Sequence, residues 1–234
     1  MPTQHEVERI KQVYGRYQRD AHIQAQWDNQ NPGNQAVLAE RQTKMGELLQ
    51  KHGFYPLRGL KVLEVGCGSG NVLASLTDLG AFPDDLYGVD LLPERIAAAK
   101  QKYPDIHFDC VNGEQLEFAD GAFDLVLVFT VFSSILDQSM AHNVAREISR
   151  VLKPGGTLLW YDFRFNNPRN AHVQGMGRQH IQQLFPTHHT HLQTITVLPP
   201  LVRRLGRWST QLYPLLAYIP WLRTHYIGLL QKSI

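Results

Sequence analysis

Three glycines at alternate positions stand directly after an apolar run in VLEVGCGSGN, residues 62–71. Gly66, Gly68 and Gly70 would let a nucleotide-like ligand approach backbone N–H groups at the start of a helix. A dinucleotide fingerprint would place its third glycine at position 71, where the chain has Asn71, and a phosphate-binding loop would need Lys-Ser or Lys-Thr after the glycines. The spacing weakens the first interpretation and excludes the second.

Asp90 ends the run LYGVD, residues 86–90, twenty positions after Gly70. An acidic side chain at this place can accept hydrogen bonds from both hydroxyls of a ribose, or it can cap the helix that follows. Together with the glycine turn, Asp90 favours a ligand that contains a ribose but no pyrophosphate.

The elements that must position these residues alternate between short apolar runs and helical segments, a pattern typical of a parallel sheet with helices on both faces. Helices are expected over 4–28, 34–52 and 140–152. Strands are expected over residues 60–65, 86–90, 106–111, 123–131, 157–163, 191–198 and 224–232. The sequence therefore predicts an α/β fold.

The chain has 234 residues, 43% of them hydrophobic, and this size fits one domain with a substantial core. No run of eighteen apolar residues occurs and the segment MPTQHEVERIKQ is polar, so we expect a cytoplasmic protein. Cys67 and Cys110 lack the spacing of zinc ligands and are expected to be buried thiols. The cluster THHTH has no neighbouring carboxylate and is expected to be a solvated face, so no metal site is predicted.

Charge is distributed unevenly along the chain, although the net charge is only +2. Residues 163–234 contain no Asp or Glu but eight Lys and Arg residues. This third of the chain either faces an anionic partner, such as a substrate, a lipid headgroup or a nucleic acid, or is a basic surface without a partner. Both interpretations stay open from the sequence alone.

Residues 58–163 resemble the class I S-adenosylmethionine-dependent methyltransferases, most closely their small-molecule, type 11-like branch. The motifs that carry the resemblance are VLEVGCGSG, YGVDLLPERIAAAK, CVNGEQLEF, FDLVLVFTVFSSI and ISRVLKPGGTLLWYDF. The resemblance implies S-adenosyl-L-methionine as the cofactor and a Rossmann-like, seven-stranded, mostly parallel sheet. It further implies a single domain made of an N-terminal helical lid (1–55), a cofactor-binding core (58–198), a helical cap above the cofactor site (199–223) and a final strand (224–234).

The resemblance also assigns roles to individual residues. Those implied to bind the cofactor are Glu64, Gly66, Cys67, Gly68, Gly70, Asp90, Leu91, Asn112, Gly113 and Phe129. Two places depart from the family: Val-Asn-Gly at 111–113 replaces Gly-Asp-Ala, and Ser133 with Ser134 replaces a His-His pair that could supply a base. Asn112 can still accept a hydrogen bond from adenine through its amide oxygen.

Methyl transfer from a sulfonium needs alignment and exclusion of water more than it needs a base. The segment WYDFRFNNPRN is the richest candidate for acceptor chemistry, with Tyr161 and Asp162 as catalytic candidates. Asp162 would orient or deprotonate an acceptor, or it would merely pair with Arg164. Residues expected to contact the acceptor are Tyr14, Tyr17, Ser133, Arg164, Arg169, Arg203 and Trp208.

The resemblance implies methyl transfer to a small molecule, and we expect the acceptor to be a hydroxyl of an apolar or acidic metabolite, a glycan or a natural-product intermediate. A peripheral contact between an anionic membrane and the basic C-terminal third is a further expectation, and no specific nucleic acid is predicted. Methylation of RNA or protein, a non-catalytic cofactor-binding role and a nicotinamide-dependent oxidoreductase remain alternatives.

Overall fold

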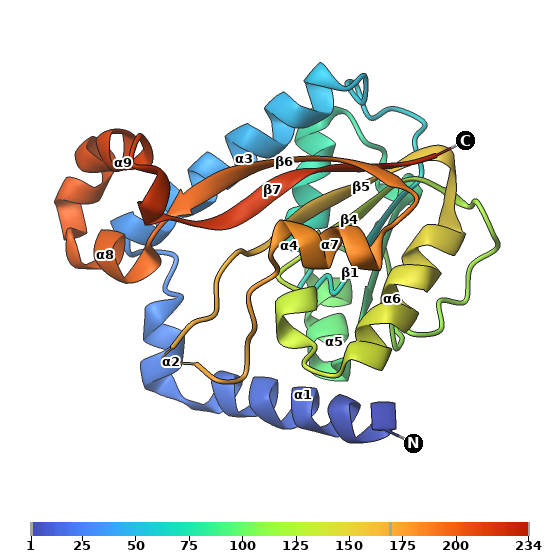
Figure 1. Cartoon of the computed structure of the whole chain (residues 1–234), viewed down its shortest axis with the longest axis horizontal. Helices are drawn as coiled ribbons and strands as arrows, with labels where there is room; N and C mark the ends of the chain where they lie inside the picture. Colours follow the sequence, from blue (N-terminus) through green and yellow to red (C-terminus); the bar gives the residue numbers. More distant parts are fainter. Residues whose placement is uncertain (1, 169, 234) are drawn as a thin grey trace.

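The structure, a computed structural model that describes residues 2–168 and 170–233, is built on a seven-stranded sheet (Figure 1). The strand order is β3-β2-β1-β4-β5-β7-β6; β1 to β5 are parallel, and β7 runs antiparallel to both of its neighbours. The strands are β1 Val62–Val65, β2 Leu86–Asp90, β3 His107–Cys110, β4 Phe123–Phe129, β5 Leu152–Phe163, β6 His188–Val197 and β7 Arg223–Lys232. The expected seven-stranded, mostly parallel sheet is confirmed.

The α-helices of the described residues are α1 Pro2–Arg19, α2 Ala21–Gln26, α3 Pro32–Lys51, α4 Asn71–Ala74, α5 Pro93–Lys102, α6 Gln138–Val151, α7 Arg178–Leu184, α8 Pro199–Arg204 and α9 Ser209–Ala217. The expected helix over 4–28 is divided at Asp20. The carboxylate of Asp20 accepts hydrogen bonds from the N–H groups of His22 and Ile23 and so begins a new helix, α2. Asn31 caps α3 in the same way.

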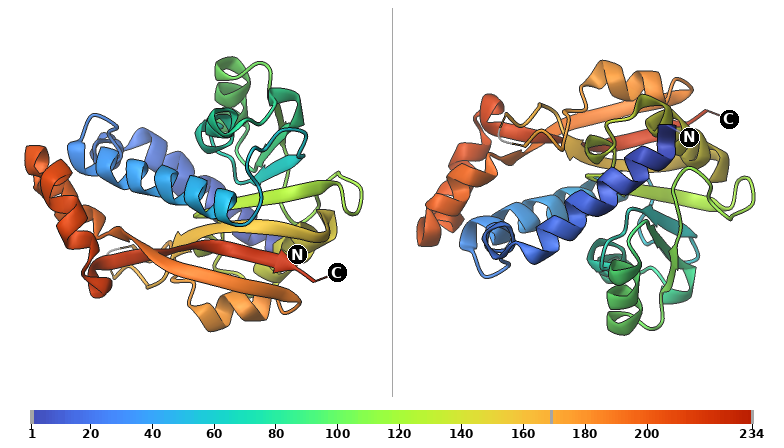
Figure 2. Two further views of the ribbon diagram at one scale, coloured as in Figure 1. Left: turned by 90° about the horizontal axis from the view of Figure 1, so that it is seen from above. Right: turned by 90° about the horizontal axis from the view of Figure 1, so that it is seen from below.

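Helices cover both faces of the sheet (Figure 2). One core lies between the sheet and α1, α6 and α7, and it contains the fully buried side chains of Ile148, Trp160 and Ile181. The other core lies between the sheet and α3, α4 and α5, and it contains Leu49 and Leu73. Because burying one such side chain contributes roughly 2 kcal/mol, the two cores hold the strands and fix where each strand ends.

The cap between β6 and β7 packs on α3, at the end of the molecule where α2 lies (Figure 1). A Cβ atom on Gly33 of α3 would lie only 2.4 Å from the carbonyl oxygen of Val202 in α8. The hydroxyl of Tyr213 in α9 donates to Glu40 of α3 at 2.6 Å. A helical cap is therefore present, but the expectation that it lies above the cofactor site is wrong, because α3 supplies the face on which it packs.

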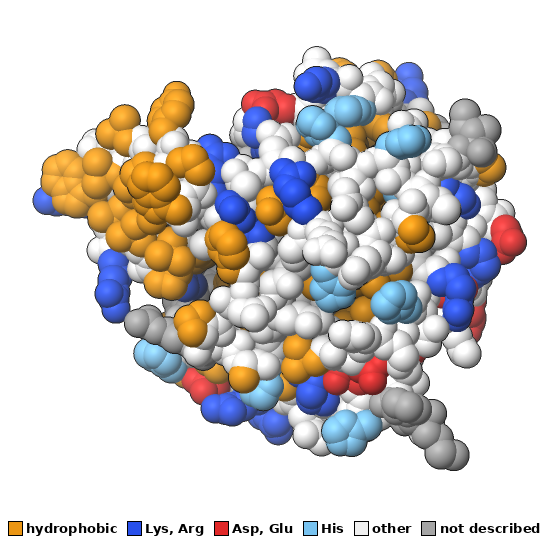
Figure 3. All heavy atoms as spheres, viewed as in Figure 1, with side chains coloured by type: hydrophobic (Ala, Val, Ile, Leu, Met, Phe, Trp, Pro, Cys, Tyr) orange, Lys and Arg blue, Asp and Glu red, His pale blue; other side chains and the backbone are white. Residues whose placement is uncertain are grey.

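The outer side of the cap is apolar and exposed. Figure 3 shows hydrophobic side chains gathered over α8 and α9, with Lys and Arg side chains at the edge of this region. Within residues 2–168 and 170–233, no helix combines the length and the hydropathy that a membrane span requires.

The two cysteines have different surroundings. Cys67 is 6% exposed, whereas Cys110 is exposed on β3. The expectation that both thiols are buried is wrong for Cys110, because β3 is an edge strand with a neighbour on one side only.

Candidate functional site

A cavity of about 270 Å³ lies where β1, β2, β3 and β4 end, and α1 contributes Ile10 and Tyr14 to its wall. The first turn of α5, the turn after β4 and one face of α6 complete its walls. The predicted cofactor ligands that line the cavity are Gly66, Asp90, Leu91, Asn112, Gly113 and Phe129. The structure thus gathers residues from four strand ends around one space, as expected for a ligand site in an open α/β sheet.

The glycine turn leaves bare backbone in the cavity wall. Gly66 has a φ of 75°, and a Cβ atom there would lie 2.6 Å from Cγ2 of Val131, another lining residue. Gly70, with a φ of 76°, caps α4, and a Cβ atom on it would lie 2.6 Å from Cζ of Phe108. A side chain at Gly66 would displace the cavity wall, and one at Gly70 would clash with Phe108 behind the turn, so the turn requires glycine and leaves the backbone of Gly66 open to a ligand.

Asp90 presents a fixed carboxylate to the same cavity. It is 6% exposed, and its oxygens accept hydrogen bonds from the N–H groups of Gly68 at 2.8 Å and Leu92 at 2.9 Å. A carboxylate offers about four acceptor positions, so some remain for the hydroxyls of a ligand. Asp90 therefore caps the following turn and also lines the cavity, while its binding of a ribose stays a prediction.

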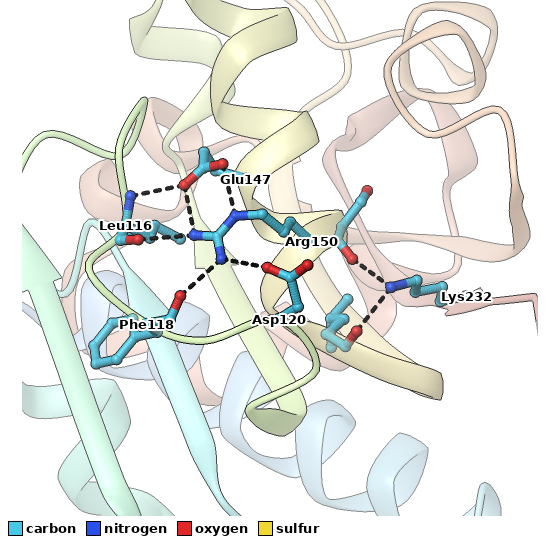
Figure 4. Close-up of polar contacts among 8 residues, drawn as sticks. Leu116, Phe118, Asp120, Glu147, Arg150 and Lys232 are labelled. Atoms are coloured by element: carbon cyan, nitrogen blue, oxygen red, sulfur yellow. Dashed lines mark hydrogen bonds and ion pairs between the residues drawn. The ribbon is translucent and has the colours of Figure 1, made fainter.

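Arg150 of α6 holds the chain segment that follows Asn112 (Figure 4). Its guanidinium donates to the carbonyl oxygens of Leu116 at 2.8 Å and Phe118 at 2.7 Å, and it pairs with Glu147 at 2.8 Å. These bonds tie the segment after β3 to α6, whose own side chains line the cavity. The wall formed by Asn112 is thereby supported from outside.

An ion pair fastens α1 over the cavity. Glu6 pairs with Arg9 at 2.7 Å and accepts a hydrogen bond from the N–H of Leu136 at 2.6 Å, while Arg9 donates to the carbonyl oxygen of Ser134 at 2.6 Å. Burial opposes ionisation, but the bonds from Arg9 and Leu136 outweigh it and hold the pKa of Glu6 below its usual range. Helix α1, the first part of the predicted lid (1–55), is therefore docked through an ionised carboxylate.

Tyr14 projects from α1 into the cavity wall. Its hydroxyl lies 2.7 Å from Oγ of Ser134, and the guanidinium carbon of Arg95 lies 4.5 Å from the centre of its ring. Burial raises the pKa of the Tyr14 phenol, so the hydroxyl stays protonated at neutral pH. Tyr14 offers the cavity a hydrogen-bonding hydroxyl and an aromatic surface, not a base.

Four predicted cofactor ligands lie outside the cavity lining, namely Glu64, Cys67, Gly68 and Gly70. Glu64 is 1% exposed and accepts a hydrogen bond from the N–H of Leu73 at 3.1 Å. Burial raises the pKa of Glu64 to about 8, against the influence of the Arg41 guanidinium. Burial also raises the pKa of the Cys67 thiol, which keeps it protonated. These residues support the turn, and their direct contact with a cofactor stays a prediction.

Neither catalytic candidate lines the cavity. Asp162 is fully buried and accepts hydrogen bonds from the N–H groups of Ser133 at 3.0 Å and Phe163 at 2.8 Å. Burial raises the pKa of Asp162 to about 6, although these bonds lower it. Tyr161 lies in the core on the α3 side, with its hydroxyl 2.9 Å from Oγ1 of Thr196. Asp162 therefore braces the turn after β4, and a catalytic role for either residue stays a prediction.

The predicted acceptor contacts are dispersed. Within the part of the chain that the structure describes, Tyr14 is the one that lines the cavity. Arg164 donates to the carbonyl oxygen of Arg223 at 3.1 Å, and Tyr17 accepts a hydrogen bond from Asn170 at 2.9 Å. The predicted contacts that lie away from the cavity are Tyr17, Ser133, Arg164, Arg203 and Trp208. Arg169 lies outside the described residues.

The sequence predicts no role for some lining residues, although Thr130 and Arg95 lie within the motifs of the family resemblance. Thr130 has a φ of 56°, which a β-branched residue rarely adopts, and its N–H donates to the carbonyl oxygen of Tyr161 at 2.7 Å. Its position directly after β4 could have predicted a place in the ligand site, because ligands bind at strand ends. The same holds for Arg95, which follows β2. Ile10 and Met140 reach the cavity from α1 and α6, whose docking no local pattern predicts.

Comparison with known proteins finds similarity over the segment that contains the glycine turn and Asp90. Residues 63–160 match a family described as a methyltransferase domain. A demethylmenaquinone methyltransferase of Chlorobaculum parvum is 37% identical over 97 residues, which cover 41% of this chain and 38% of the relative. A ubiquinone biosynthesis O-methyltransferase of Cereibacter sphaeroides is 30% identical over 135 residues, which cover 56% of this chain and 52% of the relative. These matches span about half the length of the curated relatives or less.

The fold is shared with solved structures. The N-methyltransferase NodS of Bradyrhizobium japonicum, in complex with S-adenosyl-L-homocysteine, matches with a TM-score of 0.67 at 17% identity, over 96% of this chain and 99% of that chain. At this identity the likeness concerns the fold alone. Residues 63–160, which contain the glycine turn and Asp90, are thus similar to a methyltransferase domain, and the fold around them is shared with a solved methyltransferase structure.

Proposed function

We propose that the protein transfers the methyl group of S-adenosylmethionine to an acidic hydroxyl, such as that of a phenol or an enol, on a small apolar molecule. The observation that carries the proposal is the cavity itself. It joins the bare backbone of Gly66 and the carboxylate of Asp90 to an apolar wall made by Ile10, Ile135 and Met140. The first part suits an adenosyl ligand and the second suits an apolar acceptor.

Each part of the site has a defined task in this proposal. Asp90 would accept hydrogen bonds from the ribose hydroxyls, and Asn112 would meet the adenine edge. The cofactor, when bound, supplies an electrophilic methyl group on a positively charged sulfur. α1 would keep water from the cavity through Ile10 and Tyr14, so the protein contributes alignment in a dry site.

The ionisable residues that line the cavity in the described part of the chain include no evident general base, which favours an acceptor that loses its own proton readily. Among the described lining residues these are Tyr14, Asp90 and Arg95. Tyr14 stays protonated because burial raises its pKa, and Asp90 is engaged by two backbone N–H groups. A phenol ionises near pH 10 and needs less help than an aliphatic alcohol. The names of two relatives, which refer to demethylmenaquinone and to ubiquinone biosynthesis, support an acceptor related to quinones.

Two measurements test the proposal. In a thermal-shift titration, we expect S-adenosylmethionine to raise the unfolding temperature, NAD to have no effect, and Asp90→Ala to abolish the response. With S-adenosylmethionine labelled in its methyl group, we expect label in apolar phenols and not in matched aliphatic alcohols or amines. Stabilisation by NAD alone would sink the cofactor assignment. Label in RNA or protein, or binding without any turnover, would replace the small-molecule acceptor by one of the alternatives.

A further inference from the structure

Large apolar side chains are exposed together on the outer side of the cap. We call this the cap surface; its residues are Trp208, Leu212, Leu215, Tyr218 and Trp221. Tyr218 is 84% exposed and Trp221 is 78% exposed, so packing within the chain leaves both almost uncovered. Soluble proteins seldom gather such residues on one face unless the face binds something.

The cap does not need this surface for its own folding. Its inner side holds Val202 and Tyr213, which are buried beside Val197 in a small separate core. Tyr213 bonds to Glu40, and the hydroxyl of Ser209 donates to the carbonyl oxygen of Val202 at 2.7 Å. The inner side therefore fixes the cap, and the outer side is left free to meet a partner.

Arginines accompany the apolar side chains. Arg204 and Arg207 are exposed, and the Arg207 guanidinium carbon lies 5.3 Å from the centre of the Trp208 ring. Arg203 lies over Trp27, which is 63% exposed and extends the apolar region toward α2. Residues 163–234 contain no acidic residue to neutralise these cations. A partner that combines an apolar interior with negative charge would suit the cap, whose own residues add only positive charge to this face.

We propose that the cap surface is a docking site for the surface of an anionic lipid bilayer. Tryptophan and tyrosine suit the boundary between headgroups and acyl chains, because each carries an apolar ring and a polar group. Arginine binds lipid phosphates through charge-assisted hydrogen bonds. α9 carries no charged residue and exposes Leu212 and Leu215, so it can lie with this side among the acyl chains. The inference goes beyond the proposed methyl transfer and does not depend on it.

Vesicle sedimentation tests the proposal with the 234-residue chain. We expect binding to vesicles of phosphatidylglycerol mixed with phosphatidylcholine, little binding to phosphatidylcholine alone, and weaker binding as salt screens the charges. Arg204→Gln with Arg207→Gln should lower the affinity on the order of twentyfold. Trp208→Ser, Tyr218→Ser and Trp221→Ser together should lower binding to the level of neutral vesicles, although the arginines remain.

A matched control lies on another face. Arg58 is exposed and its guanidinium carbon lies 5.1 Å from the ring of Phe82, which is 44% exposed, so the pair has the same chemistry as Arg207 with Trp208. Arg58→Gln with Phe82→Ser should leave vesicle binding unchanged, and all variants should keep the wild-type circular dichroism and S-adenosylmethionine affinity. The proposal is overturned if wild type ignores anionic vesicles, or if the control weakens binding as much as the cap variants do. It is also overturned if the cap variants instead dissociate a dimer in sedimentation equilibrium.

Discussion

One methyl group separates glycine from alanine at position 66, and the cavity has no room for it. The Cβ atom would meet Val131, and both residues line the same space. The site therefore depends on the absence of a side chain at Gly66 as much as on the carboxylate of Asp90. Two backbone N–H groups hold that carboxylate in place.

Gly66→Ala should therefore weaken S-adenosylmethionine binding by about tenfold or more, because the new Cβ atom would displace Val131, a residue of the cavity wall. Isothermal titration calorimetry measures the change. Gly53→Ala is the matched control, since Gly53 also has a positive φ, 81°, but a Cβ atom there meets nothing within 4 Å. It should cost about 1–2 kcal/mol of stability and leave the affinity unchanged. Equal affinity losses in both variants would contradict the role of Gly66 in the cavity wall.

Glu64 gives stability a pH dependence of known sign. Burial lifts its pKa from 4.5 to about 8, so the folded protein holds this proton more tightly than the unfolded chain does. The stability that the group contributes is complete below about pH 4.5 and is lost as the pH rises through about 8. The free energy of unfolding of wild type should therefore fall more steeply over this range than that of Glu64→Gln, whose amide oxygen can still accept from Leu73.

Urea unfolding at several pH values measures this difference. The control is Glu47→Gln, because Glu47 is exposed on α3 and pairs only at the surface with Lys44. It should keep the wild-type slope. If Glu64→Gln and wild type have parallel pH profiles, the buried carboxyl does not titrate as its surroundings indicate.

At the scale of single elements, the docking of α1 decides whether the cavity is closed. Glu6→Gln should loosen it, because a neutral amide cannot replace a carboxylate that serves Arg9 and the N–H of Leu136 at once. Hydrogen bonds to charged groups contribute about 1.5–3 kcal/mol. Hydrogen exchange of residues 2–19 should accelerate, and S-adenosylmethionine should dissociate faster.

Glu8→Gln is the control on the same helix, since Glu8 is exposed and lies 3.9 Å from Lys11. It should leave both exchange and dissociation as in wild type. Unchanged exchange in Glu6→Gln would mean that apolar contacts, such as that of Ile10, hold the lid without the ion pair.

Some elements could be predicted from local sequence patterns and others could not. Strand positions and the turn at Gly66 follow from local signals, namely runs of apolar residues and glycines in fixed places, so they could be predicted. The positions of α1, α3 and the cap depend on contacts between distant segments, such as Gly33 with Val202. Asp162 lies at a strand end as expected, but only tertiary packing decides that it bonds to Ser133 instead of facing the cavity.

At the scale of the whole molecule, the cap and the cavity are separate parts. Val197 and Arg223 are paired across β6 and β7, and no described residue between them lines the cavity. Replacing residues 198–222 by Asn-Gly should therefore close a two-residue hairpin and keep S-adenosylmethionine affinity. Stability should fall because α3 loses its cover. Calorimetry with urea unfolding tests this, and a folded variant without cofactor affinity would contradict the separation.

The strand order has a consequence for how the chain is made. Among the described strands β7 is synthesised last, yet it is the neighbour of both β5 and β6, and it is the strand with which β6 pairs in the described sheet. During synthesis, β6 therefore cannot join the sheet until β7, which ends at Lys232, has emerged from the ribosome. Until then, α3 and the cap also lack the completed sheet beside them. Contacts of this range make folding slow and leave strand edges open in the meantime. Deletion of β7 would thus also weaken the structure at the end of the molecule where α3 and the cap meet.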